Sequence, residues 1–409
     1  MTSQTDSEAP EKRYERRYEL DWLRIIAVIL VWVFHNIITF RVGGWTISNN
    51  DATFAANATE VLLGGFGMPF FAVISGMAIY HFIEKVDIQK LRSEKAKLLI
   101  KARFVRLMIP FLFGLFTYIS VMQYFYGLQL GTVTESFLEF YLQRYFFEGW
   151  STQGGWFIVM GYHLWYLLIL FVWSVVALPL FIRFRKQHIR ERLSNMAAFF
   201  DRPGAIYLLI LPIVAIEVLN PFTQFMIDIG PGGMRQGGWH ILSYLVFLIY
   251  GYIFASDSRY EKILEDHSHP AFVLAILLAI ILVPIWITLT AAGELNPLSA
   301  PPAVFLLMIV YCWSMIIVII SFGRRRLSFN HQRLKFLNQI ALPFYILHFA
   351  VAIPVQFYVV MLPLGIIEKF LLISGISFVI IIGLALIIRQ FNPLRFLFGM
   401  SLKRGTPRT

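Results

Sequence analysis

Long apolar runs restrict the fold of this sequence more than any other feature. Ten stretches are apolar over roughly the 20 residues that a helix needs to cross a bilayer: 20–40, 62–83, 104–126, 162–182, 204–222, 239–256, 270–292, 302–322, 340–362 and 367–388. A backbone in lipid must pair its polar groups within each segment, and these runs are continuous rather than alternating. We therefore predict an all-α, polytopic membrane bundle of about ten transmembrane helices.

The positions of the positive charges predict how the bundle is oriented. If the N-terminus is inside, the cytoplasmic segments hold 31 of the 35 Lys and Arg. Only Arg41, Arg144, Arg235 and Lys369 then lie outside. This bias predicts cytoplasmic N- and C-termini and a multi-pass protein of the inner cell membrane. It also accounts for the net charge of +11 without a nucleic-acid partner.

The chain is expected to form one membrane domain, at residues 19–392, between a disordered cytoplasmic tail at 1–18 and a second cytoplasmic tail at 393–409. The first apolar run lacks a small-residue cleavage site, so we expect it to be retained as a span. Cys312 is the only cysteine, which excludes an intrachain disulfide. No histidine pair has the helical spacing of a metal site, and we predict none.

Arg24 and His35 are the first candidates for function, because ionisable groups within spans are expensive to bury. Eleven residues separate them, which on a helix places them about 20° apart around the axis and roughly 16 Å apart along it. They therefore share one face, with Arg24 at the cytoplasmic edge and His35 past the midplane. Such a face suits a long ligand with an anionic head. Taken singly, Arg24 also fits a snorkelling flank residue and His35 a core histidine.

Arg103 and Arg106 lie three residues apart at the cytoplasmic start of the third span. Arginine pairs on one helical face can grip phosphate with a fork geometry that lysine lacks. The general excess of positive charge at the inner surface explains the pair equally well.

A second group of ionisable residues falls in the outer half of the membrane on this topology. His35, His163, Glu217 and His240 come from four spans and are predicted to form one polar pocket, which His348 on the ninth span also lines. For each residue alone, an interfacial or structural role explains the position as well.

These motifs together resemble the acyltransferase-3 family of membrane O-acyltransferases over nearly the whole chain. The similarity is carried by Leu20-Asp21-Trp22-Leu23-Arg24 with His35, by Arg103, Arg106 and Pro110, and by the Tyr345-to-His348 pattern. The stretch His163-Leu164-Trp165-Tyr166-Leu167 is similar to the branch of glucan-succinylating membrane proteins.

The resemblance implies a cytoplasmic acyl-CoA donor and a glycan or related hydroxyl acceptor outside. Acyl-CoA would be a substrate, and no permanently bound cofactor is expected. Arg24, Arg103 and Arg106 would hold the donor, and His35 would act as general base or carry the acyl group as an acyl-imidazole. Glu217 or His163 would assist His35 in catalysis. The expected acceptor-binding residues are His240, His348, Asn36 and Trp165.

Two other functions fit the same sequence. A transporter of an organic anion, or a flippase of a lipid-linked sugar, also needs polar groups at mid-depth, although no inverted repeat is visible. A catalytically silent scaffold is the third alternative. Besides membrane lipid, the expected partners include a second copy of the chain in a homodimer or a separate protein that accepts the acyl group.

Overall fold

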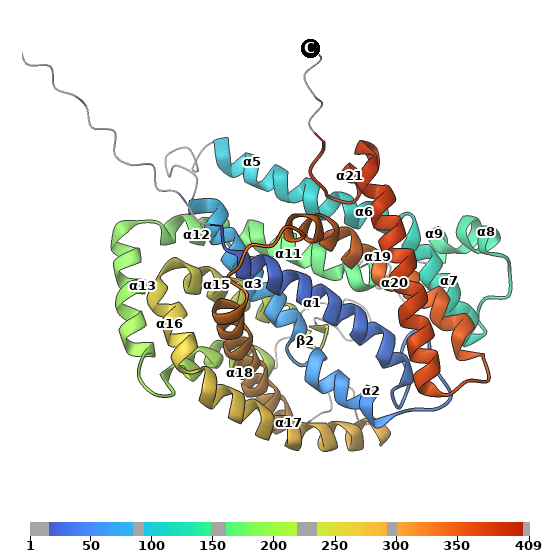
Figure 1. The fold of residues 1–409 in the computed structure, drawn as a ribbon, viewed down its shortest axis with the longest axis horizontal. Coiled ribbons are helices and arrows are strands. Elements are labelled where there is room, and N and C mark those ends of the chain that lie inside the picture. Colours follow the sequence, from blue (N-terminus) through green and yellow to red (C-terminus); the bar gives the residue numbers. More distant parts are fainter. Residues whose placement is uncertain (1–15, 85–93, 149–160, 219–234, 293–300, 404–409) are drawn as a thin grey trace, which may run out of the picture.

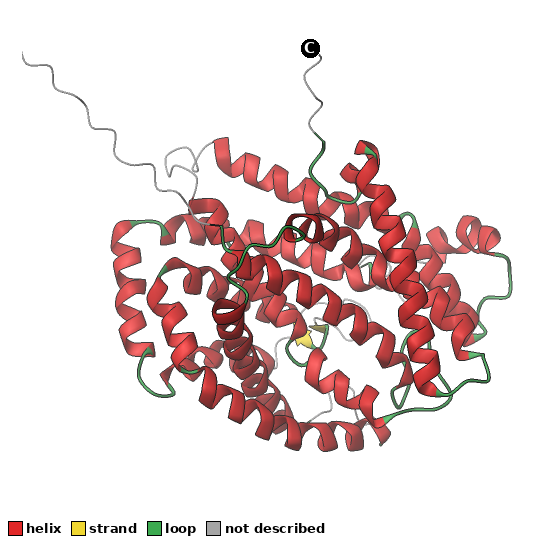
Figure 2. Ribbon diagram, viewed as in Figure 1, coloured by secondary structure: helices red, strands yellow, loops and turns green. Residues whose placement is uncertain are grey.

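The computed structural model describes residues 16–84, 94–148, 161–218, 235–292 and 301–403. These residues are almost entirely helical, and the one sheet among them is a pair of two-residue strands (Figure 2). The prediction of an all-helical bundle is therefore confirmed. The predicted N-terminal tail lies largely outside the described residues.

The first half of the chain forms a series of long and interrupted helices (Figure 1). In chain order they are α1 (Tyr18–Ile37), η1 (Ile38–Phe40), α2 (Phe54–Thr59), η2 (Glu60–Gly64), α3 (Gly67–Glu84), α5 (Glu94–Arg103), η3 (Phe104–Met108), α6 (Ile109–Leu115), α7 (Tyr118–Leu130), α8 (Phe137–Glu139), η4 (Phe140–Tyr145), α9 (Phe146–Glu148), η5 (Tyr162–Leu164), α11 (Trp165–Val176), α12 (Leu178–Phe184) and α13 (Gln187–Phe200).

The second half begins with a broken segment and ends in four long helices. Its elements are η6 (Ala205–Ile210), α14 (Leu211–Glu217), β1 (Arg235–Gln236), β2 (Trp239–His240), α15 (Ile241–Ser256), α16 (Ser258–Asp266), α17 (Ser268–Ala291), α18 (Pro302–Arg326), α19 (Leu334–Val360), α20 (Ile366–Gln390) and α21 (Asn392–Leu397). The strands pair antiparallel, with Gln236 opposite Trp239. Gly237 and Gly238 both have positive φ, as a two-residue hairpin turn requires.

Six helices in the described ranges are long and apolar enough to span a membrane, and up to nine are if each of three bent helix pairs counts as one span. The expected fifth span, at 204–222, corresponds to a shorter apolar helix at Ala205–Glu217. The count of ten therefore stays a prediction. The sharpest bend, 107°, separates α15 from α16.

α19 is the most buried of the six long spans, whereas fewer than a third of the residues of α17 and α20 are buried. Close packing near the centre depends on two glycines where α3 meets α15. A Cβ at Gly76 would lie 2.0 Å from the Leu248 carbonyl oxygen, and one at Gly251 would lie 1.9 Å from the Val73 carbonyl oxygen. Only glycine allows the two backbones to approach this closely.

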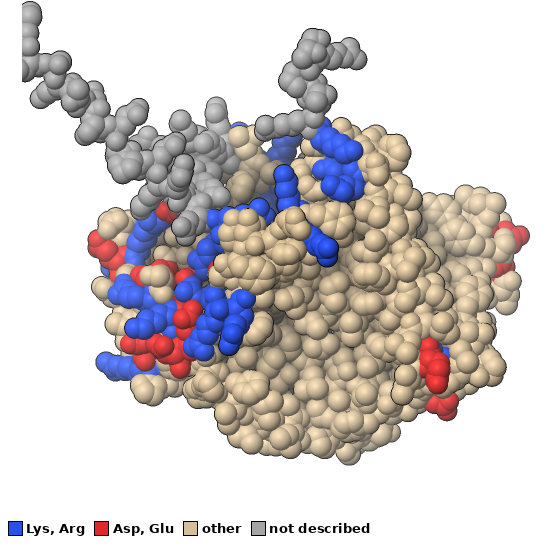
Figure 3. Space-filling view, viewed as in Figure 1, with Lys and Arg blue, Asp and Glu red and all other residues tan. Residues whose placement is uncertain are grey.

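Charged side chains gather over the upper and left parts of the view in Figure 3, and most of the remaining surface on this face is uncharged. This separation agrees with the predicted charge bias, while the side of the membrane that it faces stays a prediction. Of the four cations expected outside, Arg41 pairs with Glu60 at 2.6 Å and Arg144 pairs with Glu135 at 2.8 Å. Lys369 Nζ donates to Asn49 Oδ1 over 2.9 Å. The Arg235 side chain is outside the described part.

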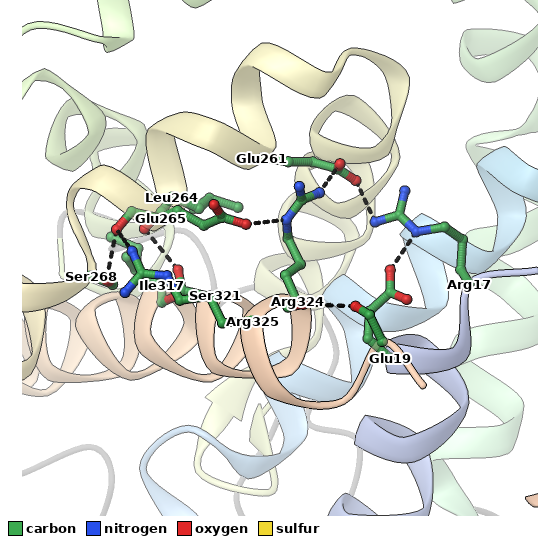
Figure 4. A network of polar contacts seen from close by, with 11 residues as sticks. Arg17, Glu19, Glu261, Leu264, Glu265, Ser268, Ile317, Ser321, Arg324 and Arg325 are labelled. Atoms are coloured by element: carbon green, nitrogen blue, oxygen red, sulfur yellow. Dashed lines mark hydrogen bonds and ion pairs between the residues drawn. The ribbon is translucent and has the colours of Figure 1, made fainter. Parts of the chain in front are cut away.

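An ion-pair network ties the start of α1 to α16 and α18 (Figure 4). Arg17 pairs with Glu261 at 2.7 Å, and Arg324 pairs with both Glu261 and Glu265. Glu261 is almost fully buried. Glu261 and Glu265 thus balance arginines from other parts of the chain, and Glu261 fixes the position from which α1 enters the bundle.

The described part of the predicted C-terminal tail folds back onto the bundle. Arg395 is buried, and its Nε and Nη1 atoms donate to the carbonyl oxygens of Ser401 (2.7 Å) and Arg389 (3.0 Å). Gly399 packs so closely that a Cβ there would lie 2.3 Å from the Arg106 carbonyl oxygen. Residues 399–401 therefore lie beside the predicted donor-binding arginines.

Candidate functional site

Three histidines from distant parts of the chain meet in the interior. His35 comes from α1, His163 from η5 and His348 from α19. The ring centroids of His35 and His348 are 5.0 Å apart, as are those of His163 and His348. His163 and His348 are buried, whereas His35 is only partly covered. We call these three residues the histidine cluster.

Carbonyl partners determine which ring nitrogens carry protons when these imidazoles are neutral, because a carbonyl oxygen can only accept. His348 Nδ1 lies 2.5 Å from the Tyr345 oxygen, so it is the protonated nitrogen and Nε2 has the lone pair. His35 Nδ1 lies 2.8 Å from the Val31 oxygen and 3.2 Å from His348 Nε2. His35 therefore donates from Nδ1, and the lone pair on its Nε2 is available to accept a proton.

His163 presents a second lone pair to the same region. Its Nε2 lies 2.8 Å from the Ile346 oxygen and donates to it, which leaves the buried Nδ1 with no hydrogen-bond partner in the part of the chain that the structure describes. The Tyr345 hydroxyl donates to the His163 carbonyl oxygen over 2.6 Å and fixes this turn against α19. An unpaired buried acceptor indicates a place for a ligand or water.

The rigid surroundings of His35 fix its backbone and its ring. Gln356 Nε2 donates to the His35 carbonyl oxygen over 2.8 Å, and the Phe349 ring lies 4.3 Å from the imidazole, centroid to centroid. Both residues belong to α19. The described residues contain no group of three or more ligating side chains able to hold a metal ion. The two imidazole lone pairs of the cluster, on His35 Nε2 and His163 Nδ1, are groups that can accept a proton or attack an electrophilic carbon.

A basic pocket of about 250 Å³ lies at the start of α1. Its cationic lining residues are Arg16, Arg24, Arg106 and Lys335, and Asp21 is its one acid. Arg24 lies 3.8 Å from Asp21. Arg103 does not line this pocket, but its charge interacts with those of Arg24 and Arg106. The structure therefore brings the three predicted arginines into one strongly positive region that suits a phosphate-bearing ligand.

α19 adds four pocket residues that the sequence did not indicate, Lys335, Asn338, Gln339 and Leu342. Lys335 and Asn338 are three residues apart on one helical face, and both line the pocket. The two amide atoms of Asn338 are buried without a hydrogen-bond partner within the described ranges. The i,i+3 spacing was the available signal, but the span was expected to start at 340, so Lys335 counted only as an inner-surface charge. Gly399, Met400 and Ser401 close one side.

α1 connects the two sites, because it continues unbroken from Arg24 to His35. The eleven-residue separation corresponds to roughly 16 Å along the axis. The buried Tyr166 lies near Arg24 and Arg103, and its ring centroid lies 5.9 Å from that of Phe71, which in turn lies 6.4 Å from that of Tyr345. The predicted placement of Arg24 and His35 on one helix thus holds in the fold.

Glu217 and His240 form a separate polar group at the start of α15. Glu217 Oε1 accepts from the His240 backbone N–H at 2.9 Å and from the Ser243 hydroxyl at 2.5 Å. His240 Nδ1 accepts from the Leu242 N–H and caps α15. Five groups were expected in one pocket. The structure brings His35, His163 and His348 together, whereas Glu217 contacts His240 and Ser243.

Asn36 and Trp165 make contacts with residues outside the histidine cluster. The Asn36 side chain is buried, and its Nδ2 donates to Ser374 on α20 over 3.3 Å. Trp165 packs against Tyr244, with ring centroids 5.3 Å apart. A Cβ on Gly237 of the hairpin turn would lie 2.8 Å from the Trp165 ring. Both residues have structural contacts that account for their positions.

Comparison with known proteins matches residues 17–390 to a protein family described as an acyltransferase domain. That range begins just before α1 and ends with α20, so it includes the histidine cluster and most of the basic pocket. No curated protein and no solved structure matches the chain.

Proposed function

The chain belongs to the acyltransferase-3 family, and we propose that it moves an acyl group from cytoplasmic acyl-CoA to a hydroxyl of an extracytoplasmic glycan. The observation that carries this proposal is the continuous α1, with Arg24 in the basic pocket and His35 in the histidine cluster. One rigid helix thereby fixes the distance between a site for an anionic head and a site for acyl chemistry. The multi-pass protein would lie in the inner cell membrane.

The basic pocket is the proposed donor site. Arg24, Arg103 and Arg106 would hold the phosphates of CoA by charge-assisted hydrogen bonds, with Lys335 as a fourth cation. Within the described residues, Arg106 and Lys335 make no ion pair. A donor phosphate would therefore bind these two cations without displacing an acidic side chain. The acyl arm would then extend along the α1 face towards His35, a separation of roughly 16 Å.

His35 Nε2 is the proposed general base. It accepts the proton of the acceptor hydroxyl while the hydroxyl oxygen attacks the thioester carbonyl carbon. The C–S bond breaks, the imidazolium returns its proton to the leaving thiolate, and the products are free CoA and the acyl ester. His348 holds the His35 ring through the 3.2 Å contact, and transfer through an acyl-imidazole uses the same lone pair.

The acceptor side is proposed from the remaining groups. The unpaired Nδ1 of buried His163 would bind or orient the hydroxyl. Glu217 and His240 are proposed to bind the glycan farther from the reacting atoms. The His163–Leu167 stretch favours a succinyl donor and a glucan acceptor, as in the branch that it resembles.

The test uses purified protein in sealed liposomes that enclose a glycan extract, with radiolabelled acyl-CoA outside. Wild type should transfer label to the glycan, and His35→Ala should lower the rate on the order of 10²- to 10⁴-fold. The matched control is His188→Ala, because His188 is an exposed histidine on α13. Retained turnover in His35→Ala would reject His35 as the base. Label that crosses the bilayer without forming an ester would instead identify a transporter.

A further inference from the structure

A second hollow, separate from the basic pocket, lies between α17 and α18. It has a volume of about 230 Å³, and its polar lining consists of Ser268, His269, Ser321, Arg325 and Arg326. Its apolar lining consists of Phe272, Val318 and Phe322. We call this hollow the α17–α18 groove. None of its residues takes part in the proposed acyl transfer.

The positive charge at the polar end of the groove is only partly neutralised by neighbouring groups. Arg326 is exposed and makes no ion pair or hydrogen bond within the described ranges. Arg325 Nη2 donates to the Glu265 carbonyl oxygen over 2.7 Å, which occupies only part of its guanidinium (Figure 4). The nearest carboxylate on α16, that of Glu265, is engaged by Arg324 at 2.6 Å. Asp266 is the one other acid at this end of α16 and is exposed.

The apolar end of the groove faces the surroundings rather than the protein core. Phe272 is 51% exposed and Phe322 is 53% exposed. Both belong to candidate membrane spans, and α17 is the least buried of the six. The surface that continues along α17 is apolar as well, with Val273, Ile276 and Ile280 exposed. Lipid tails are the medium that such a surface contacts.

We infer that the α17–α18 groove binds an anionic glycerophospholipid, with the phosphate at Arg325 and Arg326 and the acyl chains against Phe272 and Phe322. A soluble phosphate would satisfy only the arginines and would leave the adjoining aromatic surface unused. A phospholipid satisfies both, because its headgroup charge and its chains are joined in one molecule, as cations and apolar rings are joined in the lining of the groove.

A lipid bound here would join three helices. Arg325 connects α18 to the last turn of α16, and the Ser321 hydroxyl donates to the Leu264 oxygen over 2.8 Å. Ser268 begins α17 and donates to the same Glu265 carbonyl oxygen as Arg325, over 2.7 Å. The headgroup would therefore contact the point where α16, α17 and α18 meet, next to the network that holds the start of α1.

The experiment compares lipid binding to detergent-purified full-length protein by native mass spectrometry. Phosphatidylglycerol and phosphatidylcholine with identical chains are titrated in parallel. Wild type should retain phosphatidylglycerol in preference to phosphatidylcholine. Arg325→Gln/Arg326→Gln should weaken phosphatidylglycerol binding about fivefold for each charge, or about 25-fold in total, with little change for phosphatidylcholine. The control Arg183→Gln/Arg192→Gln removes two exposed arginines on α12 and α13 and should change neither affinity.

A second part of the experiment uses soluble competitors to distinguish binding of the whole lipid from binding of its headgroup alone. Inorganic phosphate and glycerophosphoglycerol should not displace phosphatidylglycerol at millimolar concentration, because they lack the chains that contact Phe272 and Phe322. Displacement by either would overturn the inference in favour of a simple phosphate site. Equal loss of affinity in the groove and control variants would also overturn it. Size-exclusion chromatography verifies that each variant is folded, and Phe272→Ala/Phe322→Ala tests the apolar half with the arginines intact.

Discussion

His348 Nε2 lies 3.2 Å from His35 Nδ1, so that a histidine on α19 holds the imidazole of another histidine 313 residues earlier in the chain. His348 is in turn fixed by the Tyr345 carbonyl oxygen. The chain of contacts leaves His35 Nε2 as the nitrogen that can accept a proton. It also makes His348 a positioning residue, whose effect on the rate of acyl transfer can be measured separately from that of His35, the proposed base.

Replacing His348 with Ala should lower kcat for acyl transfer on the order of 10- to 100-fold, because the His35 ring loses the contact that orients it. KM for acyl-CoA should stay unchanged, since His348 is distant from the basic pocket. His348→Gln should restore part of kcat, because its amide oxygen can accept from His35 Nδ1. Steady-state kinetics check this. A change confined to KM would contradict the positioning role.

Replacing Asn338 with Leu should produce opposite effects on stability and on donor binding. The Asn338 amide has two buried atoms without partners in the described ranges, so an apolar side chain of similar size should raise the free energy of unfolding by about 1 kcal/mol. Affinity for CoA should fall, because a polar lining residue is lost. Thermal unfolding and calorimetric titration measure the two effects.

Gln339→Leu is the control for Asn338→Leu. Gln339 Oε1 accepts from Arg389 Nε over 3.0 Å, so this variant loses a satisfied hydrogen bond and should not be stabilised. If both variants changed stability in the same direction, the unsatisfied amide of Asn338 would not be the cause.

Gly251→Ala should destabilise the bundle by about 1–3 kcal/mol or more, because its methyl group would lie 1.9 Å from the Val73 carbonyl oxygen and push α15 away from α3. Gly383→Ala is the matched control on α20, where an added Cβ meets nothing within 4 Å. The control should be neutral or stabilising, since alanine is the better helix former. Thermal unfolding midpoints in detergent compare the two, and similar midpoints would rule out tight α3–α15 packing.

Arg324→Gln should lower the free energy of unfolding by about 3 kcal/mol, since buried Glu261 would lose one of its two cationic partners. Adding Glu261→Gln should recover part of that loss, because the buried carboxylate, which then has only Arg17 as a cationic partner, is no longer charged. A double-mutant cycle of chemical denaturation measures the coupling. Additive effects of the two substitutions would show that the ion pair contributes nothing.

The sequence by itself determined the features that depend on local helix geometry. Continuous apolar runs specified the helices, and the eleven-residue spacing placed Arg24 and His35 on one face of α1, because rise and rotation per residue are constant. Arg103 and Arg106 were predicted on one face in the same way, but η3 (Phe104–Met108) is a π-helix, and of the two only Arg106 lines the basic pocket. The family resemblance predicted acyl transfer as the chemistry, which residue spacing alone does not indicate.

Only the tertiary structure decided which of those residues meet. His348 rather than Glu217 contacts His35, and Lys335, Asn338 and residues 399–401 complete the basic pocket. These are contacts between segments hundreds of residues apart, set by how α19 and the C-terminal segment pack against α1 and α6. Residue spacing along one helix contains no information about the rotation of another helix around it, so the placement of residues along one helix could be predicted and their partners on other helices could not.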